Sequence, residues 1–266
     1  MTVVFPAPAH LWTALLLAIA ISSAARAVRA LSWSGFFAAI AVGFALFGFA
    51  GFPGAAALLT FFISSSALSR IGKKRKDALR YEKGGERDAG QVLANGGVAA
   101  VAALGIPFLG PDTRWIYCAV LGALAAANAD TWATEIGSLA RGKPRRITDF
   151  RPVATGESGA VSLPGTLAAL LGATVIALLV PLRFPGFQGI SAVAVAGFAG
   201  SLLDSYLGAT VQEQYRDPST GRLTERRTAE DGTPLAHFRG VHGLGNDAVN
   251  FFCTLFGGTL SALFSI

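Results

Sequence analysis

The chain has 266 residues, of which 52% are hydrophobic and only 14% are charged. Soluble domains carry about 25% charged residues, so this composition excludes an ordinary soluble domain and indicates a polytopic membrane protein. The two cysteines, Cys118 and Cys253, lie in apolar runs without CxxC spacing, which argues against a disulfide framework and a zinc site.

The order of apolar runs predicts an all-α transmembrane helix bundle of about eight spans, forming a single integral membrane domain over residues 1–266. A membrane-spanning helix needs about 20 mostly apolar residues. The runs that meet this requirement are 9–27, 34–51, 54–70, 91–110, 114–137, 164–182, 187–210 and 246–265.

Three long polar connections, at 70–90, 138–163 and 211–245, separate these runs. Eight spans place all three on one side of the membrane, and every Lys and Arg except Arg114 and Arg183 falls on that side. The positive-inside rule then predicts three long cytoplasmic loops and both termini outside, in the plasma (inner) membrane of a bacterium. The net charge of +6 is explained by this orientation and by the lipid bilayer, so no nucleic-acid partner is expected.

The fifth run ends in an acidic, amide-rich stretch, 128–137, which is unusual for a membrane helix. A carboxylate at the centre of a bilayer costs roughly 2.5–3.5 kcal/mol, so Asp130 and Glu135 need a functional or structural reason. At 100° per residue, Asn128 and Glu135 share one helix face, and Asp130 widens it.

Similar side chains occur at the ends of three other runs. They are Ser201, Asp204, Ser205 and Gln212 in the seventh run, Asn246, Asp247 and Asn250 in the eighth, and Gln91 and Asn95 in the fourth. The predicted topology brings all four polar ends to the cytoplasmic side, where a charged reactant from the cytosol would bind. The amides and hydroxyls alone also fit close helix packing, whereas buried carboxylates need a cation, a proton or a partner.

The carboxylates Asp130, Asp204 and Asp247, with Glu135 nearer the interface, form an all-oxygen set that suits Mg²⁺. The connection 138–163 supplies the complementary groups for an anion. It carries basic residues and a glycine-punctuated turn whose backbone N–H groups could face phosphate oxygens. These residues are Lys143, Arg145 and Arg146, followed by Gly156, Ser158, Gly159 and Ser162.

Five motifs together resemble those of the integral membrane family that contains the plant phytyl-phosphate kinase and the animal transmembrane protein nineteen. The motifs lie at 91–96, 128–137, 156–162, 200–212 and 246–251, and the resemblance covers about residues 30–266. Two departures from the family pattern are Glu157 in the glycine turn and the segment 243–245 ahead of Asn246.

The resemblance implies a kinase that uses a nucleoside triphosphate, with CTP favoured, to convert an isoprenoid monophosphate such as phytyl phosphate into the diphosphate. The resemblance and the polar helix ends together predict catalytic roles for Asp130, Asp204, Asn128 and Asn250. They also predict that Mg²⁺ binds Asp130, Asp204, Asp247 and Glu135. The expected substrate-binding residues are Asn95, Lys143, Arg145, Arg146, Gly156, Ser158, Gly159, Ser162, Ser205, Gln212 and Asn246.

Two alternatives stay open from the sequence. A cytidylyltransferase acting on a lipid phosphate would release pyrophosphate, whereas a kinase releases CDP. A cation-coupled transporter would also need buried carboxylates, but transporters usually place them near the membrane midplane. The position of the carboxylates beside long basic loops favours an enzyme at the interface.

Overall fold

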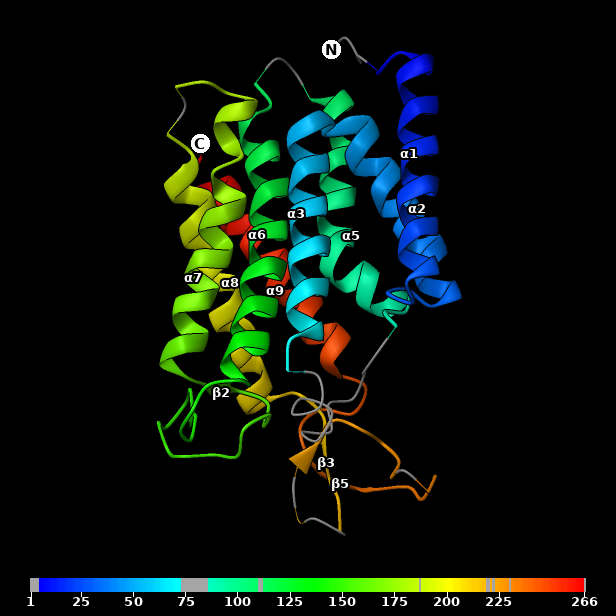
Figure 1. Cartoon of the computed structure of the whole chain (residues 1–266). Coiled ribbons are helices and arrows are strands. Elements are labelled where there is room, and N and C mark those ends of the chain that lie inside the picture. The colour runs from blue at the N-terminus through cyan, green and yellow to red at the C-terminus, as the bar shows by residue number, and fades with distance from the viewer. Residues whose placement is uncertain are drawn as a thin grey trace.

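The computed structural model describes residues 5–72, 86–109, 112–186, 188–218, 221, 223–229 and 231–265. Most of the predicted connection 70–90 therefore lies outside the described residues. Within the described ranges, long helices run side by side in one bundle (Figure 1). Both chain ends lie at one end of this bundle, and the described parts of the connections 138–163 and 211–245 lie at the other (Figure 1).

Each of the eight apolar runs corresponds to a long helix in the described part of the chain. The helices are α1 Pro8–Ala27, α2 Trp33–Phe49, α3 Gly51–Arg70, α5 Ala89–Gly105, α6 Arg114–Gly137, α7 Leu163–Ala177, α8 Ile190–Thr210 and α9 Asn246–Leu263. Short 3₁₀ turns containing Pro107 and Pro181 follow α5 and α7, because proline cannot donate the hydrogen bond that would continue an α-helix.

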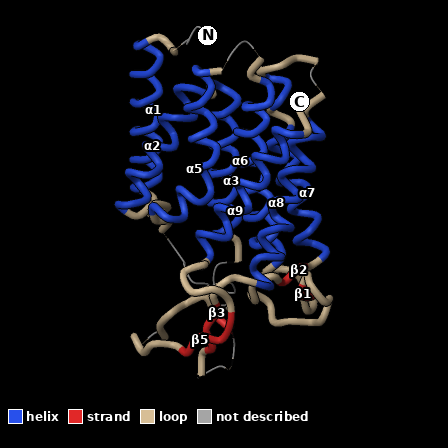
Figure 2. Tube along the Cα trace, turned by 180° about the vertical axis from the view of Figure 1, so that it is seen from behind, coloured by secondary structure: helices blue, strands red, loops and turns tan. Residues whose placement is uncertain are grey.

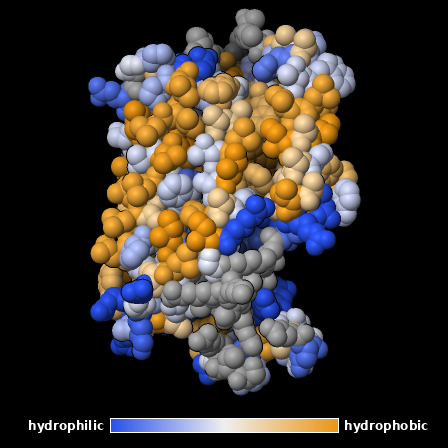
Figure 3. Space-filling view, viewed as in Figure 1, coloured by the Kyte–Doolittle hydropathy of each residue, from blue (hydrophilic) through white to orange (hydrophobic). Residues whose placement is uncertain are grey.

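The helical, membrane-embedded character of the chain is confirmed in part. Among the described residues, five helices are long and apolar enough to cross a membrane, and α2 is a shorter apolar helix of 17 residues. Apolar side chains cover the middle of the visible face, and hydrophilic ones gather toward its ends (Figure 3). Eight spans and the orientation across the membrane stay predictions.

Helix α6 occupies the centre of the bundle and packs against α3, α5, α7, α8 and α9. Small residues allow this close approach. A Cβ on Gly197 of α8 would lie 2.6 Å from Ala125 Cβ, and a Cβ on Gly257 of α9 would lie 2.6 Å from Ala126 Cβ. Because lipid tails are as apolar as leucine side chains, membrane helices rely on such close contacts for their association.

Two small antiparallel sheets depart from the all-α prediction, and both lie in the long connections (Figure 2). Strand β1 (Arg145–Arg146) pairs with β2 (Ala160–Val161), with Arg146 opposite Ala160. In the third connection, β3 (Gln214–Arg216) lies between β4 (Leu223–Thr224) and β5 (Ala236–Arg239). Strands of two to four residues are too short for an alternating apolar pattern to reveal them.

Side-chain caps fix where several helices begin. Ser32 accepts a hydrogen bond from Gly35 N at the start of α2, and Ser162 accepts one from Gly165 N at the start of α7. Asp88 and Gln91 form a reciprocal capping box at the start of α5. Gln91, part of a polar motif in the sequence, therefore has a structural role here.

Candidate functional site

Four carboxylates gather at the end of the bundle that carries the long connections. Asp130 lies in the last turns of α6, Asp204 in the last turns of α8, Asp247 in the first turn of α9, and Glu225 directly after β4. Asp130, Asp204 and Glu225 interact electrostatically with one another, and Glu225 also interacts with Asp247. We call these four residues the carboxylate cluster; in it Asp130 and Asp204 interact directly, and Asp247 is linked to them through Glu225.

Glu225 is the member of the cluster that the sequence did not single out. Its carboxylate accepts a hydrogen bond from the Ser158 hydroxyl in the glycine turn. Burial raises the pKa of Glu225, the side chains of Ser158 and Gln212 lower it, and the charge of Asp247 raises it again. The chain therefore holds an acidic group at a place where desolvation and like charges disfavour its ionised form.

The all-oxygen chemistry of the carboxylate cluster suits a hard divalent cation such as Mg²⁺. Among the described residues, however, the group whose candidate ligand atoms lie within 4.8 Å of one another is Glu213, His237 and His242. The Asp204 Oδ2 atom is buried and has no hydrogen-bond partner among the described residues. A buried carboxylate oxygen among other carboxylates needs a cation or a proton, and Mg²⁺ is usually bound by one or two carboxylates together with waters and phosphate oxygens. A Cβ on Gly90 would collide with the Asp247 carboxylate, so the glycine at the start of α5 leaves room for that group.

The glycine turn ahead of α7 packs directly on the end of α8. Gly156 and Gly159 have φ angles of 88° and 81°, in the left-handed region that favours glycine. A Cβ on Gly159 would lie 2.6 Å from Ala209 Cα, and one on Gly208 would lie 3.0 Å from Gly159 N. These contacts bring Ser158 to the carboxylate cluster, where it meets Glu225.

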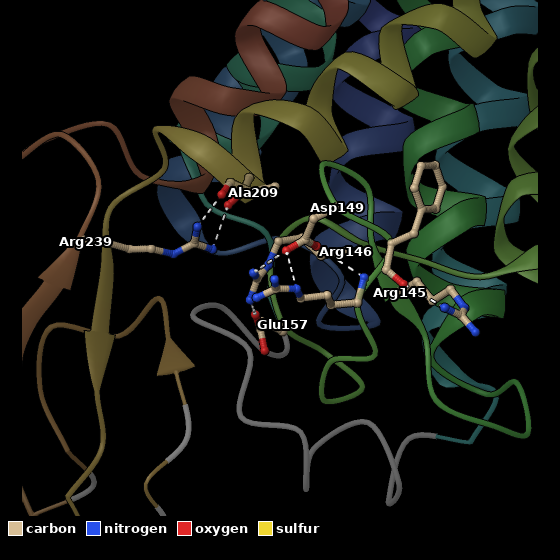
Figure 4. A network of polar contacts seen from close by, with 9 residues as sticks. Arg145, Arg146, Asp149, Glu157, Ala209 and Arg239 are labelled. Atoms are coloured by element: carbon tan, nitrogen blue, oxygen red, sulfur yellow. Dashed lines mark hydrogen bonds and ion pairs between the residues drawn. The ribbon is translucent and has the colours of Figure 1, made fainter.

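The side chain of Arg146, in the connection 138–163, points toward the glycine turn (Figure 4). Its Nη2 lies 3.0 Å from Glu157 Oε1, and its Nη1 lies 3.4 Å from Asp149 Oδ2. Glu157, which departs from the family pattern, is therefore the ion-pair partner of Arg146.

Arg239 joins the same network from β5, and the sequence did not indicate it (Figure 4). It donates hydrogen bonds to the carbonyl oxygens of Gly208 and Ala209 and, through Nε at 2.9 Å, to Gln214 Oε1. Burial lowers the pKa of Arg239, and the nearby charge of Arg146 lowers it further. Two guanidinium groups thus lie close to each other beside the end of α8.

Arg145 and Lys143 are not brought into this network. The Arg145 side chain points away from Arg146 and donates to the Phe150 carbonyl oxygen at 2.8 Å (Figure 4). Successive residues of a strand project to opposite faces, which separates these two neighbours of β1. Lys143 is exposed. Of the three predicted basic contacts, the geometry favours Arg146 alone.

Asn128 has a packing position instead of the predicted catalytic one. It is 0% exposed, its Oδ1 accepts from Ser64 Oγ at 3.1 Å, and its Nδ2 donates to Gly172 O at 2.8 Å. Each polar atom of the amide already has a protein partner, so Asn128 joins α3, α6 and α7. The helix-face pattern could not reveal this, because it does not tell which neighbouring helix an amide meets.

Glu135 has different partners from the other predicted metal ligands. Its carboxylate accepts a hydrogen bond from Ser69 of α3 and interacts electrostatically with Arg87. The structure therefore brings Glu135 to α3, and Asp130 of the same helix to α8 and the loop after β4. Glu225 takes the place in the cluster that the sequence gave to Glu135.

The remaining predicted residues lie at the expected end of the bundle with differing surroundings. Gln212 is 3% exposed beside Glu225, and Asn95 donates to the Gln91 carbonyl oxygen of its own helix at 2.9 Å. Ser205 is partly buried near the end of α8, and Asn246 and Asn250 are partly buried in the first turns of α9.

A separate polar group centres on Glu213, just after α8. This buried carboxylate accepts from Tyr215 Oη at 2.5 Å, lies 2.8 Å from Arg227 Nη2 and 2.9 Å from His242 Nδ1, and accepts from Gly243 N at 3.2 Å. These hydrogen bonds, led by that of Tyr215, hold the pKa of Glu213 down at about 2. The group ties together the two ends of the connection that carries β3, β4 and β5.

Comparison with known proteins places the chain in a membrane family. A family model described as integral membrane protein DUF92 matches residues 16–258. The chain is 34% identical to Protein PGR of Arabidopsis thaliana over 249 residues, covering 82% of this chain and 83% of that protein. No solved structure matches the chain.

Two microbial membrane proteins are also similar. The uncharacterized membrane protein MJ0933 of Methanocaldococcus jannaschii is 31% identical over 254 residues, covering 96% of this chain and 94% of that protein. The uncharacterized membrane protein sll0875 of Synechocystis is 32% identical over 170 residues, covering 62% and 66%. The chain therefore belongs to the DUF92 family of integral membrane proteins.

Proposed function

We propose that this protein is a kinase that transfers the terminal phosphoryl group of a nucleoside triphosphate, with CTP favoured, to an isoprenoid monophosphate such as phytyl phosphate. The product is the isoprenoid diphosphate, and the nucleotide leaves as CDP. The proposed site is the carboxylate cluster with the adjoining glycine turn, facing the cytoplasm of a bacterial cell.

The observation that carries this proposal is the meeting of four carboxylates beside Arg146 and the glycine turn. Asp130, Asp204 and Glu225 interact although they come from α6, α8 and the connection after β4. Carboxylates brought together in a partly buried place are stabilised by a cation or by protonation, and the nearby Arg146 and backbone N–H groups suit an anion. A magnesium triphosphate supplies both. When bound, the ion would neutralise charge on the phosphate oxygens.

Phosphoryl transfer depends mainly on position and charge neutralisation, and these residues supply both. Asp130, Asp204, Asp247 and Glu225 would hold the cation, and Ser158 would fix Glu225 through its hydrogen bond. Arg146 would bind phosphate oxygens after leaving Glu157. An oxygen of the lipid monophosphate forms the new bond to the terminal phosphorus of CTP while the bond from that phosphorus to the bridging oxygen breaks.

The acceptor needs no strong general base, because a phosphate monoester is already ionised at neutral pH. This agrees with the polar helix ends, which contain no histidine. The hydrophobic chain of the acceptor would lie along the apolar surface of the bundle, so that its phosphate reaches the end where the carboxylate cluster lies.

The test is a product analysis with the full chain in lipid nanodiscs. Phytyl monophosphate, Mg²⁺ and CTP labelled on its γ-phosphate are supplied, and lipid and nucleotide products are separated. We expect the label in phytyl diphosphate and one CDP for each molecule formed. Parallel reactions with ATP and GTP measure the nucleotide preference.

Two results would contradict the proposal. Release of pyrophosphate with cytidine on the lipid would indicate cytidylyl transfer. A protein that consumes no nucleotide in the kinase assay, and that drives uptake of a solute into proteoliposomes with a cation gradient, would be a transporter.

A further inference from the structure

Arg87 occupies an unusual position between α3 and the first turn of α5. Its Nη2 donates to Ser65 Oγ at 3.0 Å, and its Nη1 donates to Ser66 Oγ at 3.3 Å. The guanidinium carbon lies 5.9 Å and 5.4 Å from the ring centroids of Phe61 and Phe62. The charged group is therefore held by hydroxyls and aromatic rings of one helix.

The backbone of Arg87 is fixed on both sides. Its N–H donates to Ala30 O at 3.0 Å, and its carbonyl oxygen accepts from Ser32 N at 2.9 Å. A Cβ on Gly35 would collide with the Arg87 carbonyl oxygen, so the first turn of α2 needs a glycine there. This support holds the guanidinium in place before any ligand arrives, which lowers the entropy cost of binding.

Among the described residues, several arginines form ion pairs and Arg87 does not. Arg26 lies 3.0 Å from Glu86, Arg114 lies 2.8 Å from Asp112, and Arg146 lies 3.0 Å from Glu157. Within the described ranges, Arg87 hydrogen-bonds to the two serine hydroxyls and forms no ion pair.

The electrostatic surroundings of Arg87 leave its charge incompletely compensated. Burial lowers its pKa, and Glu135, itself bound by Ser69, opposes this effect through its charge. A desolvated guanidinium without an ion pair is expensive to keep, whereas an additional anion would stabilise it.

The position of Arg87 links it to both the lipid and the carboxylate cluster. Three residues farther along the chain, Gly90 lies against the Asp247 carboxylate. On the two helices that flank Arg87, Ile63 is 63% exposed and Leu93 is 49% exposed. Exposed apolar side chains of a membrane protein face lipid chains, so an anion carried on a lipid could reach Arg87 from the bilayer.

We propose that Arg87, with Ser65 and Ser66, binds the phosphate monoester group of a membrane lipid. The assignment of that lipid as the phosphoryl acceptor rests on the proposed kinase function. A guanidinium offers parallel N–H donors that match two phosphate oxygens, and the Ser66 hydroxyl, which accepts from Arg87, still has its proton to donate. Arg87 thus holds the acceptor phosphate, and the carboxylate cluster holds the donor.

The test measures binding without nucleotide, so that it does not depend on catalysis. The full chain in nanodiscs is titrated with farnesyl monophosphate, farnesol and inorganic phosphate, and affinity is followed by calorimetry. The variants are Arg87→Met and Arg87→Lys, with Arg26→Met as the control because Arg26 lies at the same end of the bundle in an ion pair. Ser66→Ala keeps the arginine, and it tests the site if Arg87→Met does not fold.

We expect the wild type to bind farnesyl monophosphate at least about tenfold more tightly than farnesol or inorganic phosphate. Arg87→Met should lose most of that preference, and Arg87→Lys and Ser66→Ala should lose part of it. Arg26→Met should stay within about twofold of the wild type. Unchanged affinity in the Arg87 variants overturns the inference, and so does equally tight binding of inorganic phosphate, which would indicate a site for a soluble anion.

The inference and the proposed function fail in different ways. Binding at Arg87 without any phosphoryl transfer would contradict the kinase function and leave the lipid-phosphate site standing. Conversely, an active kinase whose KM for farnesyl monophosphate is the same in Arg87→Lys as in the wild type would contradict this site alone. A rise in the KM for CTP without a change for the lipid would also contradict it.

Discussion

The Ser158 hydroxyl, in the turn ahead of α7, donates a hydrogen bond to the carboxylate of Glu225, which lies 67 residues later in the chain. This contact connects two of the long connections across the end of the bundle. It places a loop carboxylate beside Asp130 of α6 and Asp204 of α8. The candidate site is therefore formed jointly by helix ends and loops.

Substitution of Glu225 tests whether the loop carboxylate belongs to the site. We expect Glu225→Gln to lower kcat/KM for phosphoryl transfer by about 10- to 100-fold, the usual effect of losing a group that supports a metal site. The same assay on Asp231→Asn gives a matched control, because Asp231 is an exposed carboxylate of the same connection. Equal rates in Glu225→Gln and Asp231→Asn would remove Glu225 from the site.

The neighbours Arg145 and Arg146 give a matched pair for nucleotide binding. Arg146→Gln should raise the KM for CTP by about tenfold, since a hydrogen bond to a charged group contributes about 1.5–3 kcal/mol and tenfold corresponds to 1.4 kcal/mol. Arg145→Gln should change it less than about twofold, because that side chain bonds to the Phe150 carbonyl oxygen. Steady-state kinetics with varied CTP measures both, and a larger effect at Arg145 would contradict the geometry.

The helix ends could be predicted from the sequence, because a carboxylate in an apolar run stands out against its surroundings. Asp130, Asp204 and Asp247 were found in this way, and the order of the runs placed them at one end. Glu225 lies in a polar connection where a carboxylate is ordinary, so no local signal marked it. Only the folded connection brings it to Asp204.

Other roles depended on contacts that periodicity does not specify. Asn128 lies on a polar helix face, yet its amide binds Ser64 and Gly172 of two other helices. Glu135 lies seven residues farther along α6, and it meets Ser69 and Arg87. Helix spacing gives the face of a residue, whereas the neighbouring helix decides what that face meets.

Close packing of α9 on α6 gives a prediction about stability. A Cβ on Gly257 would lie 2.6 Å from Ala126 Cβ and 2.9 Å from the Gly122 carbonyl oxygen. We expect Gly257→Ala to destabilise the protein by about 1–3 kcal/mol through overpacking, measured by thermal unfolding in detergent. Gly105→Ala is the control, because a Cβ there would meet nothing within 4 Å. An unchanged unfolding temperature in Gly257→Ala would contradict the packing of these helices.

The Glu213 group predicts a specific dependence of stability on pH. Its pKa is about 2 in the folded protein, against an ordinary 4.5, mainly because Tyr215 donates a hydrogen bond to it. The ionised group therefore stabilises the fold above about pH 4.5, and this contribution is lost as pH falls toward 2. Thermal unfolding is measured from about pH 5 down to about pH 2.5. As the pH falls over this range, Glu213→Gln should lose less stability than the wild type. Parallel curves for the two proteins would exclude this role.

The most direct test of the proposed kinase site compares two aspartates at opposite ends of the bundle. Asp204 lies in the carboxylate cluster, and Asp112 is an exposed residue paired with Arg114 near the start of α6. Formation of phytyl diphosphate from CTP and phytyl monophosphate is measured for Asp204→Asn and Asp112→Asn at saturating Mg²⁺. We predict that Asp204→Asn loses at least about 100-fold in rate and that Asp112→Asn stays within about twofold of the wild type. A near wild-type rate in Asp204→Asn would contradict the carboxylate cluster as the site of phosphoryl transfer.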